Sequence, residues 1–175
     1  KASSNLGLVG YWSFNEGTTT TALDYSGNRN NGTLVNMALS SASSGWTSGK
    51  FSKALQFDGT NDHFNSSSTI SGLKTVSFWM KTNTGTEDIM KFGVTGGVPS
   101  TPISLTMSNF TITANGFFSA NYYIDGLSTQ LFPNDGKWHF VSITTTTAVL
   151  VDDFIVGVVD STYFNGSIDE LRLYN

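Results

Sequence analysis

The sequence contains no cysteine, few histidines and few charged residues. The absence of cysteine among the 175 residues excludes disulfides, thiolate chemistry and Cys-ligated zinc sites. The two histidines, His63 and His139, are too few for a His-rich metal site. Only 13% of the residues are charged, which is less than helical surfaces usually need, so we expect helices to be scarce.

The charge balance also limits the possible partners. The net charge is −4 and the chain has no basic run, which argues against nucleic acid, because phosphate binding needs clustered Lys and Arg. No apolar run is long enough to span a membrane, so no membrane insertion of this domain is expected. The chain begins at Lys1 rather than Met, which is typical of a piece of a longer protein.

The residue types that are abundant favour strands joined by turns. The chain has 18 glycines, 13% aromatic residues and 38% hydrophobic residues. About a dozen short segments, such as residues 8–15 and 76–81, alternate apolar and polar side chains and are separated by turn residues. This pattern predicts an all-β protein, either an antiparallel two-sheet β-sandwich or a barrel. No segment has the composition of a linker, so residues 1–175 are predicted to form a single domain.

A polar loop at residues 24–34 is the first candidate site. Its glycines permit tight turns, and side-chain oxygens come from Asp24, Asn28, Asn30 and Asn31. Flexible coordination by oxygen alone is what calcium prefers. One carboxylate is too few for tight binding, so a second ligand is expected from elsewhere in the chain.

Asp169 is the best candidate for that second carboxylate. In an extended C-terminal strand it has the same phase as Leu171 and Leu173, which are expected to face the core. A carboxylate that faces inward needs a partner, because an unpaired buried charge is very costly, and a metal ion would supply one. The alternative is that Asp169 caps a turn, or that a bulge rotates it out to water.

Six segments, in order over nearly the whole chain, resemble the laminin-G-like, concanavalin A-like lectin/glucanase jelly-roll family. They are residues 7–17, 24–28 with 31–34, 49–51 with 54–59, 76–81, 135–141 and 164–174. The resemblance implies two packed, curved antiparallel sheets. It also implies that the 24–34 loop meets Asp169 and holds calcium, with Asp24, Asn28, Asn31 and Asp169 as metal ligands.

One segment departs from the family pattern. The family usually has a Val-Asp-Gly turn where this chain has Val151-Asp152-Asp153. Residues 148–159 are expected to form a hairpin about this turn, so either a residue other than glycine tolerates positive φ there or the turn differs.

The residues do not predict an enzyme. Glycoside hydrolases of the wider superfamily need two carboxylates at a defined separation, which on a strand appear as acids two or four residues apart. The chain has no Glu-x-Asp-x-Glu pattern, and Glu87–Asp88 and Asp169–Glu170 are adjacent pairs that point in opposite directions on a strand.

Binding through aromatic and amide side chains is the more plausible chemistry, because sugars present C–H faces to rings and hydroxyls to amides and carboxylates. Trp46, in a Ser/Gly-rich segment, is the preferred candidate, unless it folds back over the core. Trp79 lies opposite the apolar face of its strand and could line a concave sheet, although large aromatic residues more often pack inside. The other candidate ligand-binding residues are Tyr122, Tyr123, Asn83, Asn121 and Asp125.

Together these features predict a non-catalytic carbohydrate-binding module of an extracellular or cell-surface protein, with a structural calcium ion and a polysaccharide or glycan as partner. An adhesion or protein-interaction domain of a bacterial surface or pilin-like protein is the alternative. A glycoside hydrolase is the least favoured hypothesis.

Overall fold

The computed structural model of the chain describes residues 6–39, 44–93 and 103–175. The described residues form strands, turns and connecting segments and contain no helix, so none of them belongs to a helix that could cross a membrane. Two antiparallel sheets, one of eight and one of seven strands, make up most of the structure. The predicted all-β, two-sheet β-sandwich is therefore confirmed.

The eight-stranded sheet has the order β12-β11-β13-β7-β17-β5-β4, and β1 also pairs with β17. Its strands are β1 (Leu8–Trp12), β4 (Gly45–Ser48), β5 (Lys53–Asp58), β7 (Ile70–Lys81), β11 (Asn121–Ile124), β12 (Leu127–Ser128), β13 (His139–Val151) and β17 (Asn165–Tyr174). The three longest strands, β7, β13 and β17, lie side by side at its centre.

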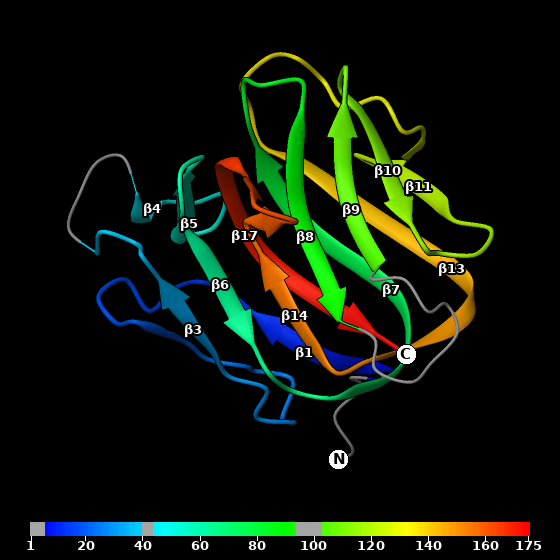
Figure 1. The fold of residues 1–175 in the computed structure, drawn as a ribbon, viewed down its shortest axis with the longest axis horizontal. Helices are drawn as coiled ribbons and strands as arrows, with labels where there is room; N and C mark the ends of the chain where they lie inside the picture. Colours follow the sequence, from blue (N-terminus) through cyan, green and yellow to red (C-terminus); the bar gives the residue numbers. More distant parts are fainter. Residues whose placement is uncertain (1–5, 40–43, 94–102) are drawn as a thin grey trace.

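The seven-stranded sheet has the order β10-β9-β8-β14-β6-β3-β2 and stacks on the first (Figure 1). Its strands are β2 (Thr21–Ala22), β3 (Gly32–Val35), β6 (His63–Ser66), β8 (Glu87–Gly93), β9 (Ile103–Ser108), β10 (Thr111–Asn115) and β14 (Asp153–Val156). A small third sheet pairs β15 (Val158–Val159) with β16 (Thr162–Tyr163).

The core lies between the two large sheets and is rich in aromatic rings. Trp12 from one sheet packs edge-on against Phe154 from the other, with ring centroids 4.8 Å apart, and against Phe64 at 5.7 Å. The indole N–H of Trp12 donates a hydrogen bond to the Asn30 carbonyl at 2.9 Å, so the buried polar atom is satisfied. Gly10 leaves room for this ring, because a Cβ at Gly10 would come within 2.4 Å of it.

The side chains of strand β7 alternate between the two faces of the eight-stranded sheet. Val76, Phe78 and Met80 are fully buried in the core, so the alternating residues Trp79 and Lys81 point away from it. We call this second side of the eight-stranded sheet the outer face. Residues paired directly opposite one another share a face, so it also contains Phe140 and Asp169, which pair with Trp79, and Ser167, which pairs with Lys81.

The prediction of a hairpin at residues 148–159 is wrong. Strand β13 ends at Val151 in the eight-stranded sheet, whereas β14 begins at Asp153 and pairs with β8 and β6 in the other sheet. The chain therefore crosses between the two layers at Asp152. Neither Asp152 nor Asp153 has positive φ, so the different connection removes the need for the glycine of the family pattern.

A bulge in β17 changes the predicted orientation of Asp169. The register shifts between Asp169 and Arg172, and Glu170 has φ of 55°. Leu171 and Leu173 face the core as expected, but the bulge puts Ile168 on the core side and Asp169 on the outer face, opposite Trp79. The predicted shared phase of Asp169 with the two leucines is therefore wrong. Asp169 is nevertheless 0% exposed, so the bulge does not turn it out to water.

Candidate functional site

Three aromatic rings form a row on the outer face. The ring of Trp79 lies 5.9 Å from that of Phe51 and 5.5 Å from that of Phe140. Phe51 is 52% exposed, and Trp79 and Phe140 are half-buried. The ammonium group of Lys50 lies over the Trp79 ring, 4.4 Å from its centroid, which is a cation–π geometry. The three rings come from the segment before β5, from β7 and from β13, and we call them the aromatic row.

A polar hollow adjoins the aromatic row. It has a volume of about 320 Å³ and is lined by Gln56, Lys81, Thr82, Asn83, Thr84, Asn165, Gly166 and Ser167. Lys81 is two residues from Trp79 on the same face of β7, and Ser167 is its cross-strand neighbour. The hydroxyl of Ser167 donates to the side-chain oxygen of Gln56 at 2.7 Å. The outer face thus combines one exposed and two half-buried rings with hydrogen-bonding groups and the two exposed lysines Lys50 and Lys81.

A buried carboxyl group lies behind this hollow. Glu87 is 3% exposed, accepts a hydrogen bond from the backbone N–H of Asn165 at 2.8 Å, and lies 3.3 Å from the hydroxyl of Thr82. Burial raises the pKa of Glu87 to about 7, although these hydrogen bonds oppose the shift. The carboxyl ties β8 to the end of the hollow without presenting an oxygen to solvent.

Asp169 lies under the loop that carries Lys50 and Phe51. One of its oxygens, Oδ2, accepts a hydrogen bond from the backbone N–H of Phe51 at 2.9 Å, whereas Oδ1 is buried without a partner. Burial raises the pKa of Asp169 to about 6. A Cβ on Gly49 would come within 2.7 Å of Oδ2, so the loop approaches the carboxylate closely because residue 49 lacks a side chain.

The carboxylate of Asp24, in contrast, is saturated within its own neighbourhood. Oδ1 accepts from the backbone N–H groups of Tyr11 at 2.9 Å and Ser26 at 2.8 Å. Oδ2 accepts from the Ser26 hydroxyl at 2.8 Å and the Asn30 N–H at 2.9 Å. Asn31 in turn accepts from the Asp24 N–H at 2.9 Å. These contacts hold a tight polar turn against β1, as expected for an Asp side chain in a turn.

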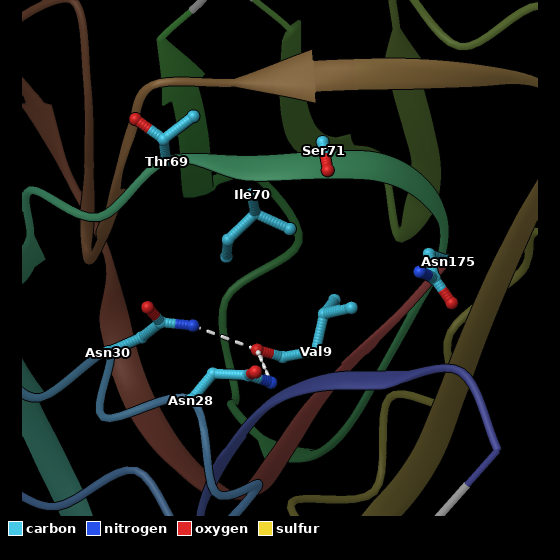
Figure 2. A pocket seen from close by; sticks show the side chains of 7 residues that line it. All are labelled: Val9, Asn28, Asn30, Thr69, Ile70, Ser71 and Asn175. Carbon is cyan, nitrogen blue, oxygen red and sulfur yellow. Dashed lines mark hydrogen bonds between the residues drawn. The ribbon is translucent and has the colours of Figure 1, made fainter.

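Asn28 and Asn30 of the same loop line a cavity with a volume of about 410 Å³ (Figure 2). Both side chains donate to the Val9 carbonyl, at 3.2 Å and 2.8 Å. The start of β7 and Asn175 close the other side of the cavity. Its lining residues include no aromatic ring and no charged side chain.

The four predicted metal ligands are thus spread over two neighbourhoods with separate hydrogen-bond partners. Asp24, Asn28 and Asn31 bond to β1 and to their own loop, whereas Asp169 bonds to the loop at residues 49–52. Among the described residues, no group of three or more His, Cys, Asp or Glu side chains is arranged to hold a metal ion. Asp169 Oδ1 is one of three buried carboxylate oxygens without a hydrogen-bond partner among the described residues, together with Glu16 Oε2 and Asp62 Oδ1, and it is the one that belongs to a predicted metal ligand.

His139 joins two turns beside the aromatic row. Its Nδ1 lies 2.6 Å from Asp125 Oδ2, and its Nε2 lies 2.9 Å from Asp135 Oδ1. Burial alone would lower the pKa of His139, but the two carboxylates raise it. In return, the hydrogen bond with His139 lowers the pKa of Asp135 to about 2. An imidazolium can donate to both carboxylates at once, so the protonated ring fixes both turns to β13.

The predicted ligand-binding residues divide into buried and accessible groups. Trp46 lies in β4, pairs with Leu55 on β5, and is 8% exposed. Its indole N–H donates to the Thr19 carbonyl at 2.9 Å. Its predicted exposure is therefore wrong, and it covers the core instead. Tyr122 is half-buried, and its hydroxyl accepts from the N–H of Ala114 on edge strand β10 at 2.9 Å. Both side chains have structural contacts that leave little for a ligand.

The remaining predicted residues lie on or near the outer face. Asn83 lines the polar hollow, Tyr123 is partly exposed opposite Ser142 on β13, and Asn121 lines a second polar cavity of about 320 Å³ next to β12. The carboxylate of Asp125 is engaged by His139 and by the Phe140 N–H at 2.9 Å. Trp79 is half-buried at the centre of the aromatic row, as its strand phase predicted.

Sequence reasoning missed Lys50, Phe51, Lys81 and Phe140 as parts of this surface. Alternation could have found Lys81, because it shares the phase of Trp79. Phe140 and Phe51 depend on which strands and loops are neighbours in the sheet, which the sequence pattern does not specify.

Comparisons with known proteins support the fold. No family model matches the chain, and no curated protein matches it. Among solved structures, a crystal structure of a mutant of HCR/D superposes with a TM-score of 0.58 at 14% identity. The match covers 97% of this chain and 49% of that one, so this chain spans about half the length of its structural neighbour. At this identity the similarity shows a shared fold alone.

Proposed function

We propose that the chain is a non-catalytic carbohydrate-binding module of an extracellular protein, and that it binds glycan on the outer face. The observation that carries this proposal is the aromatic row next to the polar hollow. The resemblance of the sequence to laminin-G-like domains supports it, and the likeness to HCR/D agrees with the β-sandwich that this family has.

The physical basis is the fit between such a surface and a sugar. An exposed ring removes the C–H face of a sugar from water, while neighbouring amides and hydroxyls replace the water bound to its hydroxyl groups. Trp79 supplies the largest ring, and Asn83 supplies an exposed amide in the adjoining hollow, next to Gln56 and Ser167, whose side chains are bonded to each other. The alternative large cavity near Asn28 has no ring to offer.

Catalysis is not part of the proposal. The two carboxyl groups with strongly raised pKa values, Glu87 and Asp169, are 3% and 0% exposed. A glycoside hydrolase needs two carboxyl groups that reach the scissile bond from the substrate cleft. We therefore expect no release of reducing sugar from any polysaccharide that the chain binds.

Binding to a panel of soluble polysaccharides by affinity electrophoresis tests the proposal. Wild-type protein should be retarded by at least one polysaccharide, and Trp79→Ala should lose most of that retardation, because the indole ring provides most of the apolar surface that would cover the C–H face of a sugar. Phe118→Ala is the matched control, since Phe118 is an exposed ring in the segment between β10 and β11, outside the aromatic row. Equal retardation of wild type and Trp79→Ala would place the binding surface elsewhere, and silence across the panel would count against glycan binding.

Calcium is the second part of the proposal, and we place it at Asp169 rather than in the Asp24 loop. Oδ1 of Asp169 is a buried carboxylate oxygen that lacks a donor, which is the environment a hard cation would complete. A cation held here would fix the loop that carries Lys50 and Phe51.

Thermal unfolding with calcium and with a chelator tests this placement. A ligand that binds the native state alone raises its stability by mass action, so calcium should raise the melting temperature of the wild type by several degrees. Asp169→Asn should abolish the response and Asp24→Asn should retain it. Loss of the response in Asp24→Asn with retention in Asp169→Asn would restore the loop as the site.

Protein binding is the alternative, and one observation favours it. Leu127 on edge strand β12 is 70% exposed and Leu131 nearby is 61% exposed. Exposed apolar side chains at a sheet edge are typical of protein contacts. A protein captured from the native environment by wild type, but not by Leu127→Ser with Leu131→Ser, and without glycan binding, would favour an adhesion or interaction domain of a surface protein.

A further inference from the structure

We propose that the outer face takes an acidic saccharide, with a carboxylate or sulfate group held by Lys81 and a sugar ring lying on Trp79. This inference rests on the glycan-binding function proposed above and specifies the class of glycan. It depends on where the few basic residues of the chain lie, on the ion pairs that they do not make, and on the position of Lys50.

The outer face carries two exposed lysines, on a chain that is acidic overall. The sequence has 13 acidic and 9 basic residues, yet the exposed ionic side chains beside Trp79 include Lys50 and Lys81. In the part of the chain that the structure describes, neither lysine has a carboxylate within 4.0 Å, and the five ion pairs there involve other bases. The acids near these lysines have other hydrogen-bond partners: Asp169 is buried under the N–H of Phe51, and Asp125, whose pKa Lys50 helps to lower, is bonded to His139.

Lys81 is placed to meet an anionic group on a sugar that stacks on Trp79. The two residues lie on the same face of β7, two positions and thus about 7 Å apart along the strand. Lys81 lines the polar hollow together with Asn83, Gln56 and Ser167. An anion in this hollow would gain a charge partner from Lys81 together with the exposed amide of Asn83, and a charge-assisted hydrogen bond is stronger than a neutral one.

Lys50 gives a reason for a preference between acidic and neutral sugars. Its ammonium covers one face of the Trp79 ring at 4.4 Å from the centroid, so a sugar that stacks on that face must displace it. A neutral sugar breaks this cation–π contact without replacing it. An acidic sugar offers the displaced ammonium a charged partner, so the same displacement favours an anionic ligand.

Titration with three oligosaccharide probes and one peptide tests this inference. The probes are oligogalacturonate, the same oligomer with its carboxyl groups reduced to the neutral sugar, heparin oligosaccharide of similar length, and poly-glutamate. The wild type should bind oligogalacturonate, heparin oligosaccharide or both about tenfold more tightly than the reduced oligomer, and poly-glutamate should bind no more tightly than the reduced oligomer. Tighter binding of oligogalacturonate would indicate a carboxylate ligand, and tighter binding of the heparin oligosaccharide would indicate a sulfate ligand.

Substitutions of two lysines on β7 distinguish a specific contact of Lys81 with the ligand from general electrostatic attraction between the protein and an anion. Lys81→Gln should lower the affinity for the acidic probe about three- to tenfold and leave the affinity for the neutral oligomer unchanged. Lys81→Arg should retain the preference. Lys74→Gln is the matched control, because Lys74 is also exposed on β7, near its other end, and it should bind all the probes as the wild type does.

The outcomes separate this inference from the proposed function. Equal affinity for the acidic and reduced oligomers, with a loss on Trp79→Ala, would overturn the acidic preference and keep glycan binding. Equal effects of Lys81→Gln and Lys74→Gln would also overturn it, because the attraction would then be nonspecific. Binding of poly-glutamate in preference to every sugar would overturn both proposals.

Discussion

The Asp24 loop and the outer face are both polar, but they use their polar atoms differently. In the loop, the carboxylate of Asp24 accepts four hydrogen bonds, and the amides of Asn28 and Asn30 are both engaged by Val9. On the outer face, Lys50 and Lys81 form no ion pair with any residue that the structure describes, and Phe51 is half exposed. Atoms that the fold already satisfies contribute to stability, whereas atoms that it leaves free are available to a ligand.

The largest expected effect is a difference in the free energy of unfolding between a variant of the Asp24 loop and a variant of the outer face. Asp24→Ala removes the acceptor of four hydrogen bonds and leaves backbone donors unpaired, so we expect the free energy of unfolding to fall by about 2–4 kcal/mol. Trp79→Ala removes a half-exposed ring and should cost about 1 kcal/mol. Urea denaturation of both variants with unchanged m-values measures these differences.

Asp24→Asn provides the control for this comparison. It keeps one acceptor oxygen, so its stability should lie between those of wild type and Asp24→Ala. A larger loss for Trp79→Ala than for Asp24→Ala would contradict the division into a structural loop and a binding face.

A second effect should appear in the pH dependence of stability. Asp169, Glu87 and His139 all have pKa values raised by the fold, to about 6 and about 7 for the two carboxyl groups. Each binds its proton more tightly in the folded than in the unfolded chain, so its contribution is present at low pH and lost as pH rises through the folded pKa. In chelator, the free energy of unfolding should therefore be about 2 kcal/mol higher at pH 5.5 than at pH 8.

Single substitutions show how much Glu87 and His139 each contribute to the pH dependence of stability. Glu87→Gln should remove the largest part of the change between pH 5 and pH 8, because its pKa is raised to about 7. His139→Gln should remove a smaller part above pH 6.5, because the pKa of His139 is raised from that value. Asp135 has a lowered pKa of about 2, so its contribution is lost only in strong acid and does not interfere. Stability that increased from pH 5.5 to pH 8 would have the wrong sign for all three groups.

The alternation of residues was sufficient to predict an all-β protein, because burial of one face imposes a period of two on every strand. It left a sandwich and a barrel open, and the resemblance to laminin-G-like domains supplied the two packed sheets. The same rule placed Trp79 away from the core. It failed at Asp169, where a bulge at Glu170 reverses the phase within one strand. It also missed strand β4, in which Trp46 is buried, because a Ser- and Gly-rich composition resembles a loop.

The candidate site was only partly predictable, because it is assembled from segments that are distant in sequence. Trp79 meets Phe140 through the pairing of β7 with β13, and it meets Phe51 through a loop that Asp169 holds from β17. These neighbours follow from the order of strands in the sheet, which local patterns do not determine. Lys81 was within reach of the sequence argument, since it lies two residues from Trp79.

A crystal structure obtained after soaking with mixed acidic and neutral oligosaccharides tests most directly where the molecule binds. We predict a sugar ring against Trp79, with Lys50 moved off the ring and an anionic group next to Lys81. A sugar held instead in the cavity between Asn28, Asn30 and Asn175 (Figure 2), with the ring of Trp79 still covered by Lys50, would contradict the assignment of the outer face.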